Sequence, residues 1–483
     1  MESIIFNQKS LDSTFIVDPI QNDEFSFGQV FSTVKELNIE GLSQSRKQKC
    51  LIISSNPYFI ISFILKCWGH INTPAVISPN LKEEDYKLLF EDISFEVIVT
   101  DDLELSKSLG ITFTNFKKNI TKSIQDSIEF NYELQNTAII LFSSGTTGKQ
   151  KIIPLSFYNI VSNINSFKNF FFIDSNTSFL CTSPVWFAHG LYNSILFAFF
   201  LQKKVIYSGV LNLFNASKVL QYCINKPEII YHLTPSMIPI LCSVAKRLNT
   251  NSLPKFKHTI CGTSYLDSKS KLYFESTFNL KLIQQYGMTE ALFISFNDKP
   301  LVKPNSVGIP LDNIEIKIFD YNSLSANQHG KIFVKSPSFC GGYLNKSESI
   351  LIDKEGFFFT GDIGYLDNEG YLHITGREKD IIKKGGLAIS PSKLNNFLME
   401  YKNIKEAYTI GKLDPYSGEE IYCFIVTEKS VDINKVKEFL KTKLNINMLP
   451  KKIFSLKQLP RNEMGKVFKK ELFKIIDTGE CLI

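Results

Sequence analysis

The chain has 483 residues, more than a single hydrophobic core usually supports, so two or three packed units are expected. Hydrophobic residues make up 44% and charged residues 21%, which excludes a disordered chain and is typical of a globular protein. The 54 basic and 48 acidic residues leave a net charge of +6 without a run of like charges, so nothing favours a nucleic-acid partner.

The start of the chain has no basic stretch followed by an apolar one, so no signal peptide is expected. The most apolar segments, residues 58–65 and 195–201, are too short to cross a membrane and predict buried helices. The nine cysteines are widely spread, without a CxxC pair or a zinc-binding spacing. That usage is typical of a reduced protein, so a soluble cytoplasmic protein is expected.

Short β-rich segments alternate with helix-length segments over the first two-thirds of the chain. Residues 50–54 predict a buried strand, and residues 58–69 predict a helix after it. The same strand pattern returns at residues 74–77, 97–100 and 204–207. Continuous apolar strands connected by helices indicate a layered α/β fold with largely parallel sheets.

The pattern changes near residue 313. Residues 314–319 and 331–335 alternate strictly between apolar and polar, which predicts strands with one face in water. They would belong to a small antiparallel sheet or barrel. Residues 364–374 predict a hairpin that turns at residues 367–370.

The last part of the chain predicts a small α+β domain. The pattern there is helix, strand, strand, helix, at residues 391–400, 404–411, 421–427 and 431–444. A tail of about a hundred residues is long enough to form a domain of its own. The linker before it, residues 377–380, is charged and not rich in Gly or Ser, which favours a defined hinge over a flexible tether.

Residues 143–151 form the first candidate site, a loop after the predicted strand 137–142. The loop combines Ser and Thr residues with two glycines and ends on lysines. Free backbone N–H groups, hydroxyls and an ammonium group are what a phosphate requires. A Walker A loop is excluded, because it would need Gly in place of Ser143 and Ser or Thr in place of Gln150. The alternative is a Ser/Gly-rich turn between strands.

Residues 285–290 form the second candidate site. Tyr286 beside Gly287 can offer an aromatic face to adenine, while Thr289 and Glu290 can reach a phosphate and a magnesium ion. The alternative is an ordinary Tyr-Gly turn followed by a helix that Thr289 caps.

Three later residues complete the set of charged candidates. Asp362 is expected in a tight turn, where its carboxylate could accept hydrogen bonds from both ribose hydroxyls. Arg377 supplies a guanidinium for the ribose or a phosphate, and Lys466 follows a turn near the C-terminus. The alternatives are an aspartate favoured only by turn geometry and a solvated surface lysine.

Together, the order and spacing of these motifs resemble the adenylate-forming, or AMP-binding, superfamily, from about residue 49 to residue 472. That superfamily contains acyl- and aryl-CoA synthetases, luciferases and peptide-synthetase adenylation domains, and the chain is most similar in character to a stand-alone acyl-CoA synthetase. The resemblance implies an α/β fold. Residues 1–378 would form two layered α/β subdomains plus a small β-barrel, and residues 379–483 a mobile α+β lid that carries Lys466.

The resemblance also implies a role for each motif residue. ATP would be bound by Ser143, Ser144, Gly145, Thr146, Thr147, Gly148, Lys151, Tyr286, Gly287, Thr289, Asp362, Arg377 and Lys466. Lys466, Thr289 and Lys151 would be catalytic, and Glu290 would bind Mg2+. The acyl pocket would contain Phe187, Ala188, His189, Gly262 and Gln285. Lys379 would be the hinge, and Gly385 and Gly386 would lie in the loop beside the incoming thiol.

The chain departs from the family pattern at several positions. Gln285 replaces a common Gly and would narrow the acyl pocket or bond a polar substrate group, and Lys331 replaces a family Glu at the expected surface. Ala188 stands where amino-acid-activating relatives carry an Asp, so an α-amino acid is disfavoured. His189 could reach the substrate or could simply start a helix. Gln150 and Ile152 replace a Pro and a Gly that provide no phosphate ligands.

The implied reaction is ATP-dependent activation of a carboxylic acid to an acyl-adenylate, with release of pyrophosphate, followed by transfer to CoA. Loading of the acyl group onto the phosphopantetheine of a separate carrier protein is the alternative. A catalytically silent acyl- or nucleotide-binding protein is disfavoured, because Lys151, Asp362, Arg377 and Lys466 are all retained. Nothing points to a luciferase-like oxidation. The particular acid and the oligomeric state stay open.

Overall fold

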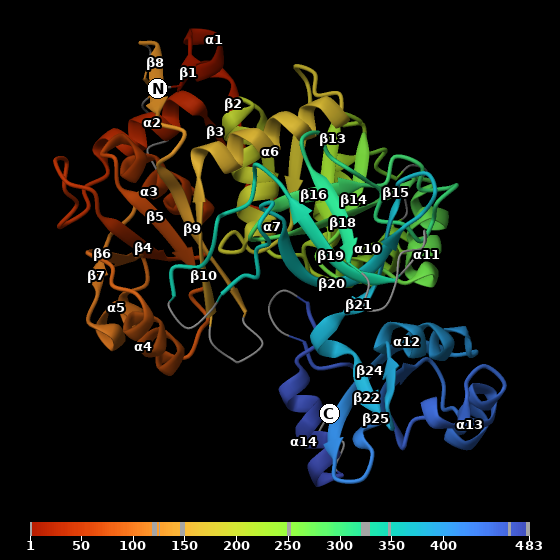
Figure 1. Cartoon of the computed structure of the whole chain (residues 1–483). Coiled ribbons are helices and arrows are strands. Elements are labelled where there is room, and N and C mark those ends of the chain that lie inside the picture. The colour runs from red at the N-terminus through yellow and green to blue at the C-terminus, as the bar shows by residue number, and fades with distance from the viewer. Residues whose placement is uncertain are drawn as a thin grey trace.

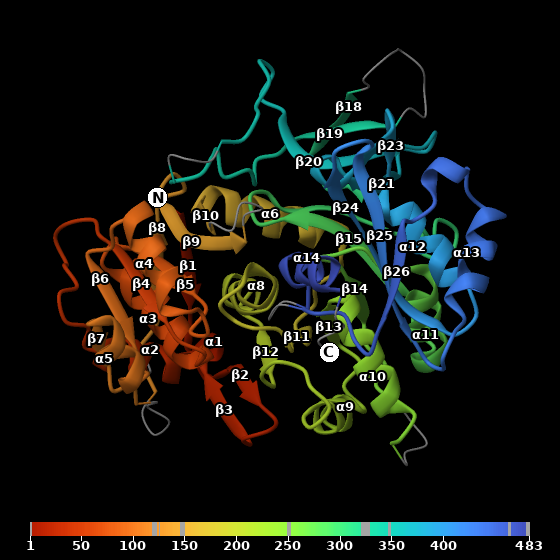
Figure 2. The same cartoon turned by 90° about the horizontal axis from the view of Figure 1, so that it is seen from below.

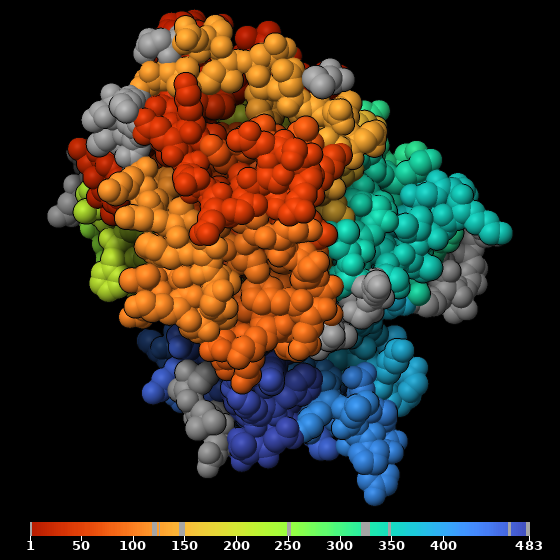
Figure 3. Space-filling model, turned by 90° about the vertical axis from the view of Figure 1, so that its left-hand side faces the viewer, coloured from red at the N-terminus to blue at the C-terminus, as the bar shows by residue number. Residues whose placement is uncertain are grey.

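The computed structural model describes residues 2–117, 123–124, 126–144, 150–248, 253–319, 329–345, 349–461 and 465–479. A large body contains the first three-quarters of the chain, and a smaller unit built from the C-terminal residues lies beneath it (Figure 1). In the space-filling view the blue C-terminal residues form the lower end of the molecule (Figure 3).

A six-stranded sheet of order β10-β9-β5-β4-β6-β7 forms the first layer of the body. Its strands are β4 (Lys49–Ile53), β5 (Thr73–Ile77), β6 (Val97–Thr100), β7 (Thr112–Phe113), β9 (Thr137–Ser144) and β10 (Gln150–Ser156). All neighbours pair in parallel except β9 and β10. The helices that follow its strands are α3 (Pro57–Gly69), α4 (Glu83–Asp92) and α5 (Leu103–Leu109).

The predicted strand and helix near residue 50 are confirmed by β4 and α3. Asn56 caps α3 by accepting hydrogen bonds from the backbone N–H groups of Tyr58 and Phe59. Pro57 occupies the first helical turn, where a backbone N–H would have no partner within the helix, so its missing N–H costs nothing. Eleven of the thirteen α3 residues are buried, since the helix packs inside the body. This explains why its sequence is apolar on every side.

A nine-stranded sheet of order β17-β16-β15-β14-β13-β11-β12-β2-β3 forms the second layer. Its strands are β2 (Thr14–Asp18), β3 (Asp23–Ser26), β11 (Ser178–Cys181), β12 (Lys204–Tyr207), β13 (Ile229–Leu233), β14 (His258–Cys261), β15 (Leu282–Met288), β16 (Leu292–Phe296) and β17 (Ile309–Pro310). The six central strands are parallel, and β3, β16 and β17 are antiparallel. The prediction of layered, largely parallel sheets is therefore confirmed.

Helices surround and join the two sheets. They are α1 (Gln8–Asp12), α2 (Phe27–Glu36), α6 (Phe157–Phe170), α7 (Ala188–Gly190), the π-helix Leu191–Leu196, α8 (Phe197–Phe200), α9 (Ala216–Cys223), the 3-10 turn Pro235–Met237, α10 (Ile238–Ala245) and α11 (Ser268–Phe278). A small pair, β1 (Glu2–Phe6) and β8 (Ile128–Tyr132), lies at one edge. One hydrophobic core rich in Phe connects both layers, and the predicted buried helix at residues 195–201 lies within it.

A four-stranded antiparallel sheet, β18-β19-β20-β21, stands where a small sheet or barrel was predicted. Its strands are β18 (Glu315–Phe319), β19 (Gly330–Lys335), β20 (Phe358–Leu366) and β21 (Leu372–Arg377). The hairpin between β20 and β21 turns at residues 367–370, as predicted, and Asp367 accepts the backbone N–H groups of Glu369 and Tyr371. A bridge between Gly308 and Leu372 joins this sheet to the end of the large one.

The C-terminal unit has a five-stranded sheet with a core on each face. Its elements are the 3-10 turn Glu378–Asp380, β22 (Ile382–Lys384), β23 (Leu387–Ile389), α12 (Pro391–Glu400), β24 (Ile404–Asp414), β25 (Gly418–Thr427), α13 (Ile433–Lys441), the 3-10 turn Ile446–Met448, β26 (Lys452–Leu456) and α14 (Lys469–Thr478). The predicted α12, β24 and β25 are confirmed. The predicted helix 431–444 is shorter, because Asp432 caps its start and the chain leaves the helix after Lys441.

Direct hydrogen bonds join the C-terminal unit to the body. Tyr265 donates from its hydroxyl to Asn396 Oδ1 at 2.6 Å, and Lys269 Nζ donates to the carbonyl of Ile404 at 2.8 Å. Seen from below, α12 lies beside α11 in the same region (Figure 2). The unit is therefore docked on the body and not merely tethered to it.

The remaining whole-chain expectations concern cysteines and membranes. The eight cysteines that the structure describes are unpaired, and seven of them are buried; Cys481 lies outside the described residues. Within the described ranges, no helix is both long enough and apolar enough to cross a membrane.

Candidate active site

The predicted phosphate loop is the end of a β-hairpin. Ser143 and Ser144 are the last residues of β9, and Lys151 lies in β10 directly across from Ser143. The prediction that the loop begins at Ser143 and extends to Lys151 is therefore wrong, because strand pairing continues to the base of the hairpin. Gly145, Thr146, Thr147 and Gly148, at its tip, lie outside the described residues.

Lys151 belongs to a partly buried polar triad with Tyr343 and Glu290. Its ammonium donates to Tyr343 Oη at 2.6 Å, and the Tyr343 hydroxyl donates to Glu290 Oε1 at 2.6 Å. The Lys151 Nζ and Glu290 Oε1 atoms are 3.7 Å apart, and Glu290 is buried. Tyr343 was not predicted from the sequence; its only signal was the glycine pair, residues 341 and 342, before it.

Asp362 joins Tyr286 and Arg377. The Tyr286 hydroxyl donates to Asp362 Oδ2 at 2.7 Å, and Arg377 Nε lies 2.9 Å from Oδ1. Asp362 raises the pKa of Arg377, and burial raises the pKa of Tyr286. Both carboxylate oxygens of this buried aspartate are thus engaged.

The expectation that Asp362 sits in a tight turn is wrong. It lies in the middle of β20, opposite Arg377 of β21 in the antiparallel register. The neighbouring glycines suggested a turn, but Gly361 instead takes a left-handed conformation, with φ of 82°, inside the strand. The carboxylate is fixed by cross-strand pairing and not by a turn.

Thr289 and Glu290 lie in the tight turn between β15 and β16. Gly287 is required there, because a Cβ at this position would overlap the carbonyl oxygen of Leu292 on the returning strand. The alternative reading of a helix capped by Thr289 is wrong, because β16 follows. The turn places Thr289, half-buried, next in sequence to the buried Glu290.

Lys466 reaches this group of residues from the C-terminal unit. Its pKa is lowered by burial and by the charge of Arg377, while the charges of Glu290 and Asp362 act in the opposite direction. The surface-lysine alternative is therefore wrong: the side chain is half-buried and within electrostatic reach of the three charged residues. Only the docked C-terminal unit brings Lys466 near these residues.

The Lys466 loop is seated on the body through Gly465. That glycine has φ of 73°, and a Cβ added to it would overlap Oγ of Ser236 in the 3-10 turn after β13. Ser236 was not predicted as a site residue, and nothing in its local sequence marks it. Its hydroxyl lies 2.9 Å from that of Thr234, at the carboxyl end of β13.

The predicted acyl-pocket residues occupy two places. Phe187, Ala188 and His189 lie at the start of α7, Gly262 directly follows β14, and Gln285 lies in the middle of β15. A Cβ on Gly262 would overlap the carboxamide of Gln285, so those two residues are in contact.

His189 is a buried, neutral imidazole. Burial lowers its pKa to about 4, and the nearby charge of Lys466 acts in the same direction. Its Nδ1 lies 3.2 Å from Nδ2 of Asn193, and its ring lies 6.5 Å from the ring of His232. His232 of β13 was not predicted, since a single His in an apolar strand carries no pattern; burial lowers its pKa as well.

Lys379 lies in the 3-10 turn Glu378–Asp380 that connects the body with the C-terminal unit. Burial and the charge of Arg377 lower its pKa to about 8. Asp380 pairs with Lys469 at 2.5 Å, and Glu378 pairs with Lys331 at 2.7 Å. Lys331 was expected at the surface, but this ion pair leaves it half-buried.

The predicted thiol-side loop lies apart from the charged cluster. Gly385 and Gly386 form the turn between β22 and β23, with φ of 56° and 81°. Both glycines are exposed, and a Cβ on either would meet no atom within 4 Å. In this arrangement the loop faces solvent.

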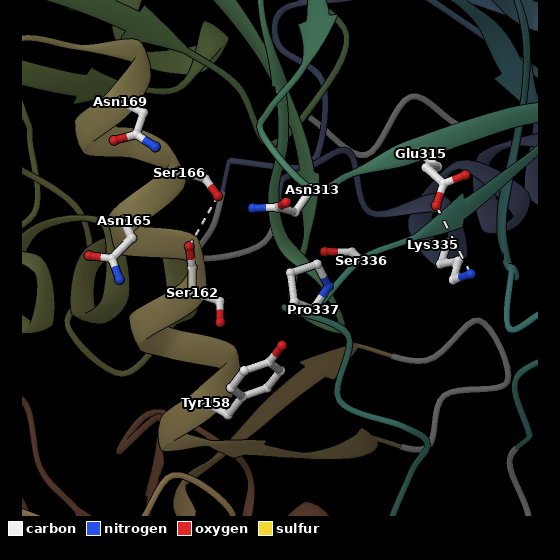
Figure 4. A pocket seen from close by; sticks show the side chains of 10 residues that line it. All are labelled: Tyr158, Ser162, Asn165, Ser166, Asn169, Asn313, Glu315, Lys335, Ser336 and Pro337. Atoms are coloured by element: carbon white, nitrogen blue, oxygen red, sulfur yellow. Dashed lines mark hydrogen bonds and ion pairs between the residues drawn. The ribbon is translucent and has the colours of Figure 1, made fainter. Parts of the chain in front are cut away.

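A hollow of about 620 Å³ lies elsewhere, between α6 and the strands β18 and β19 (Figure 4). Its lining is polar and includes Asn165, Asn169, Asn313 and Ser336. None of the predicted site residues lines it, so the charged cluster and this hollow are separate features.

Comparison with known proteins agrees with the geometry. The profile of the AMP-binding enzyme family matches residues 7–344, and that of the AMP-binding enzyme C-terminal domain matches residues 393–466. The chain belongs to the AMP-binding enzyme family. This protein is an enzyme of the AMP-forming acid–thiol ligase class.

Its relatives are CoA ligases with low sequence identity. The 2-succinylbenzoate–CoA ligase of Staphylococcus aureus is 26% identical over 86% of this chain and 88% of its own length. The 4-coumarate–CoA ligase 2 of Nicotiana tabacum is 27% identical over 87% of this chain and 83% of its own. The o-succinylbenzoate coenzyme A synthetase of Bacillus subtilis, solved with ATP and magnesium, has a TM-score of 0.81 at 21% identity and covers 98% of this chain and 100% of its own.

Proposed function

We propose that this enzyme uses ATP to activate a carboxylic acid and transfers the acyl group to the thiol of CoA. The observation that supports the proposal is that Lys466, which comes from the C-terminal unit, is close enough to Glu290, Asp362 and Arg377 of the body for their charges to act on its pKa. A cation delivered by a separately folded unit to a nucleotide-binding cluster suits a step in which negative charge develops. The CoA ligase relatives favour CoA as the acceptor.

In the first step, an oxygen of the carboxylate would attack the α-phosphorus of ATP, and the bond to the bridging oxygen would break. Pyrophosphate leaves, and the acid becomes a mixed anhydride with AMP. Lys466 would stabilise charge on the reacting carboxylate and α-phosphate, and Thr289 would donate to the same phosphate. Lys151 and the hairpin tip that precedes it would bind the outgoing phosphates, since catalysis of such a transfer rests on positioning and cations.

The nucleoside would be held by the Asp362 cluster. Tyr286 would pack on adenine, and Asp362 would exchange its present donors for ribose hydroxyls, with Arg377 beside it. Glu290 offers a hard carboxylate oxygen for Mg2+, which would neutralise phosphate charge. In the part of the chain that the structure describes, no three His, Cys, Asp or Glu side chains gather to hold a metal. The single carboxylate of Glu290 fits Mg2+, which is commonly bound by one or two carboxylates together with substrate phosphates.

In the second step, the CoA sulfur would attack the acyl carbon, and AMP would leave. We infer that residues 379–483 turn about Lys379 between the two steps, which would withdraw Lys466 and bring the exposed Gly385–Gly386 turn to the acyl carbon. The two glycines would let a pantetheine arm approach the backbone closely. The unpaired cysteines favour a cytoplasmic setting for this chemistry.

Exchange of labelled pyrophosphate into ATP tests the proposal, since it requires the acid and reports only the first step. With a broad panel of acids, at least one should support exchange. The Lys466→Ala variant should lower that exchange at least about 100-fold, because a cation at the reacting centre is lost. The exposed Lys470 of α14 offers a matched control, and Lys470→Ala should retain the activity.

Two other outcomes would replace the proposal. If no acid supported exchange, the chain would be a silent nucleotide- or acyl-binding protein. If acyl-adenylate formed but AMP were released with a phosphopantetheinylated carrier protein and not with CoA, the enzyme would load a separate carrier.

A further inference from the structure

The substrate of the acyl site is restricted by Gln285, and this inference rests on the proposed function. Strands β13, β14 and β15 run in parallel, so their carboxyl ends meet at one edge of the sheet. Gly262 follows β14 at that edge, and Gln285 lies one residue past the partner of Cys261 in β15. In open α/β sheets ligands bind at such carboxyl ends.

The Gln285 side chain fills the space that two glycines leave. A Cβ on Gly262 would overlap its carboxamide oxygen, and a Cβ on Gly287 would lie 2.8 Å from its Nε2. The carboxamide therefore covers the backbone of Gly262. A long alkyl chain could not run along that backbone while the amide stays there, since the two would occupy the same volume.

His189 is linked to this amide through a chain of ring contacts: its ring lies 6.5 Å from that of His232, which stacks on Phe293 at 5.5 Å, and Phe293 pairs with Gly287 beside the amide. His189 is 8% exposed, and its Nε2 forms no hydrogen bond with the residues that the structure describes. The charge of Lys466 acts on His189, so the imidazole lies on the side where the carboxylate would react. A buried imidazole nitrogen without a partner is costly, and a substrate group that bonds it would recover that cost.

Cations that could hold a second carboxylate are already engaged. Lys151 faces Glu290 through Tyr343, and Arg377 is paired with Asp362. Lys466 is assigned to the reacting carboxylate. A second negative charge in the acyl site would thus be buried without a partner, which is strongly unfavourable.

We propose that the acid activated by this enzyme is short and carries an uncharged hydrogen-bonding group, such as a hydroxyl or a keto group, which contacts the Gln285 carboxamide and the His189 imidazole. Gln285 is then a specificity-determining residue: its volume excludes long chains, and its amide selects the polar group.

Pyrophosphate exchange with four acids tests this: butanoate, hydroxybutanoate, dodecanoate and succinate. The wild-type enzyme should prefer hydroxybutanoate over each of the others by at least about tenfold in kcat/KM, because a site with unpaired polar groups rejects the analogue that cannot bond them. Gln285→Leu keeps the volume and removes the amide, so it should abolish the preference for hydroxybutanoate over butanoate while still excluding dodecanoate. Gln285→Gly removes the volume and should admit dodecanoate.

The outcomes separate this inference from the proposed function. A wild-type enzyme that uses dodecanoate or succinate best, or a size preference that is the same in Gln285→Gly, would overturn the inference and leave the ligase function intact. Exchange with none of the four acids, in the wild type and in both variants, would also overturn it, and the broad acid panel then decides whether the ligase function fails as well.

Discussion

At the scale of single residues, Asp362 shows how much of the site depends on one carboxylate. Its two oxygens are engaged by Tyr286 and Arg377, which come from different sheets. A buried carboxylate that accepts one hydroxyl and one guanidinium hydrogen bond is fixed in direction. The residue proposed to hold the ribose is therefore already oriented by its neighbours.

Asp362→Asn should weaken ATP binding more than it affects the fold. The amide nitrogen cannot accept the hydrogen bond from Arg377, so KM for ATP in pyrophosphate exchange should rise about 10- to 100-fold, with a stability loss of about 1–3 kcal/mol. Asp367→Asn, on the hairpin at the end of the same strand, removes an ion pair with Lys303 and should leave KM near the wild-type value. Equal effects of the two substitutions on KM would contradict the assignment of Asp362.

At the scale of elements, the loop before α14 determines whether Lys466 reaches the site. Gly465 touches Ser236 of the body, and Arg461 donates to the carbonyl of Gly465 at 2.6 Å. The loop is thus held on both sides, by its own domain and by the turn after β13. A side chain at residue 465 would disturb the contact between this segment and Ser236.

Gly465→Ala should therefore slow the first step selectively. The new Cβ would overlap Ser236, and alanine would have to adopt the left-handed φ of 73°, which is unfavourable for a residue with a Cβ. Pyrophosphate exchange should therefore fall at least about tenfold. Thioester formation from a synthetic acyl-adenylate should fall much less. Gly479→Ala is the matched control, because Gly479 has φ of 70° but open space around it. The double variant Gly465→Ala with Ser236→Gly should recover part of the exchange; no recovery would show that the contact with Ser236 is unimportant.

At the scale of the whole molecule, two neutral histidines are enclosed where β13 meets α7. Burial lowers the pKa of His189 to about 4, and it lowers the pKa of His232 as well. In the unfolded chain both would have the ordinary value of about 6.5. As the pH falls below that value, the unfolded chain takes up protons that the folded protein does not, so the free energy of unfolding must decrease.

His189→Gln should make unfolding less sensitive to acid. Between about pH 6.5 and pH 5 the wild-type protein should lose about 2 kcal/mol of unfolding free energy through His189 alone, and the variant should lose correspondingly less. Urea denaturation at several pH values measures this difference. The exposed His329 provides a control, since His329→Gln also removes one imidazole but leaves the buried His189 in place. An identical slope in the wild type and in His189→Gln would contradict a neutral buried His189.

The sequence by itself determined the local features of this protein. Apolar runs of strand length predicted β4, β5, β6 and β12, because a strand buried on both faces is apolar at every position. Strict alternation predicted β18 and β19, because a strand buried on one face is apolar at every second position. The order of the motifs also predicted the family, and most residues of the charged cluster belong to those motifs. The elements β26 and α14 were not predicted, because neither pattern was recognised in their sequences.

The tertiary structure alone decided how distant residues meet. It moved Asp362 from a turn into a strand, since antiparallel pairing with β21 outweighs the turn preference of its glycines. It added Tyr343, which bonds Glu290 across 53 sequence positions and Lys151 across 192. It also added Ser236 and His232, which contact residues of other elements. It also turned Lys466 from one lysine among many into a member of the cluster. Contacts of this kind leave no local pattern, because they are fixed by packing between segments that are far apart in the chain.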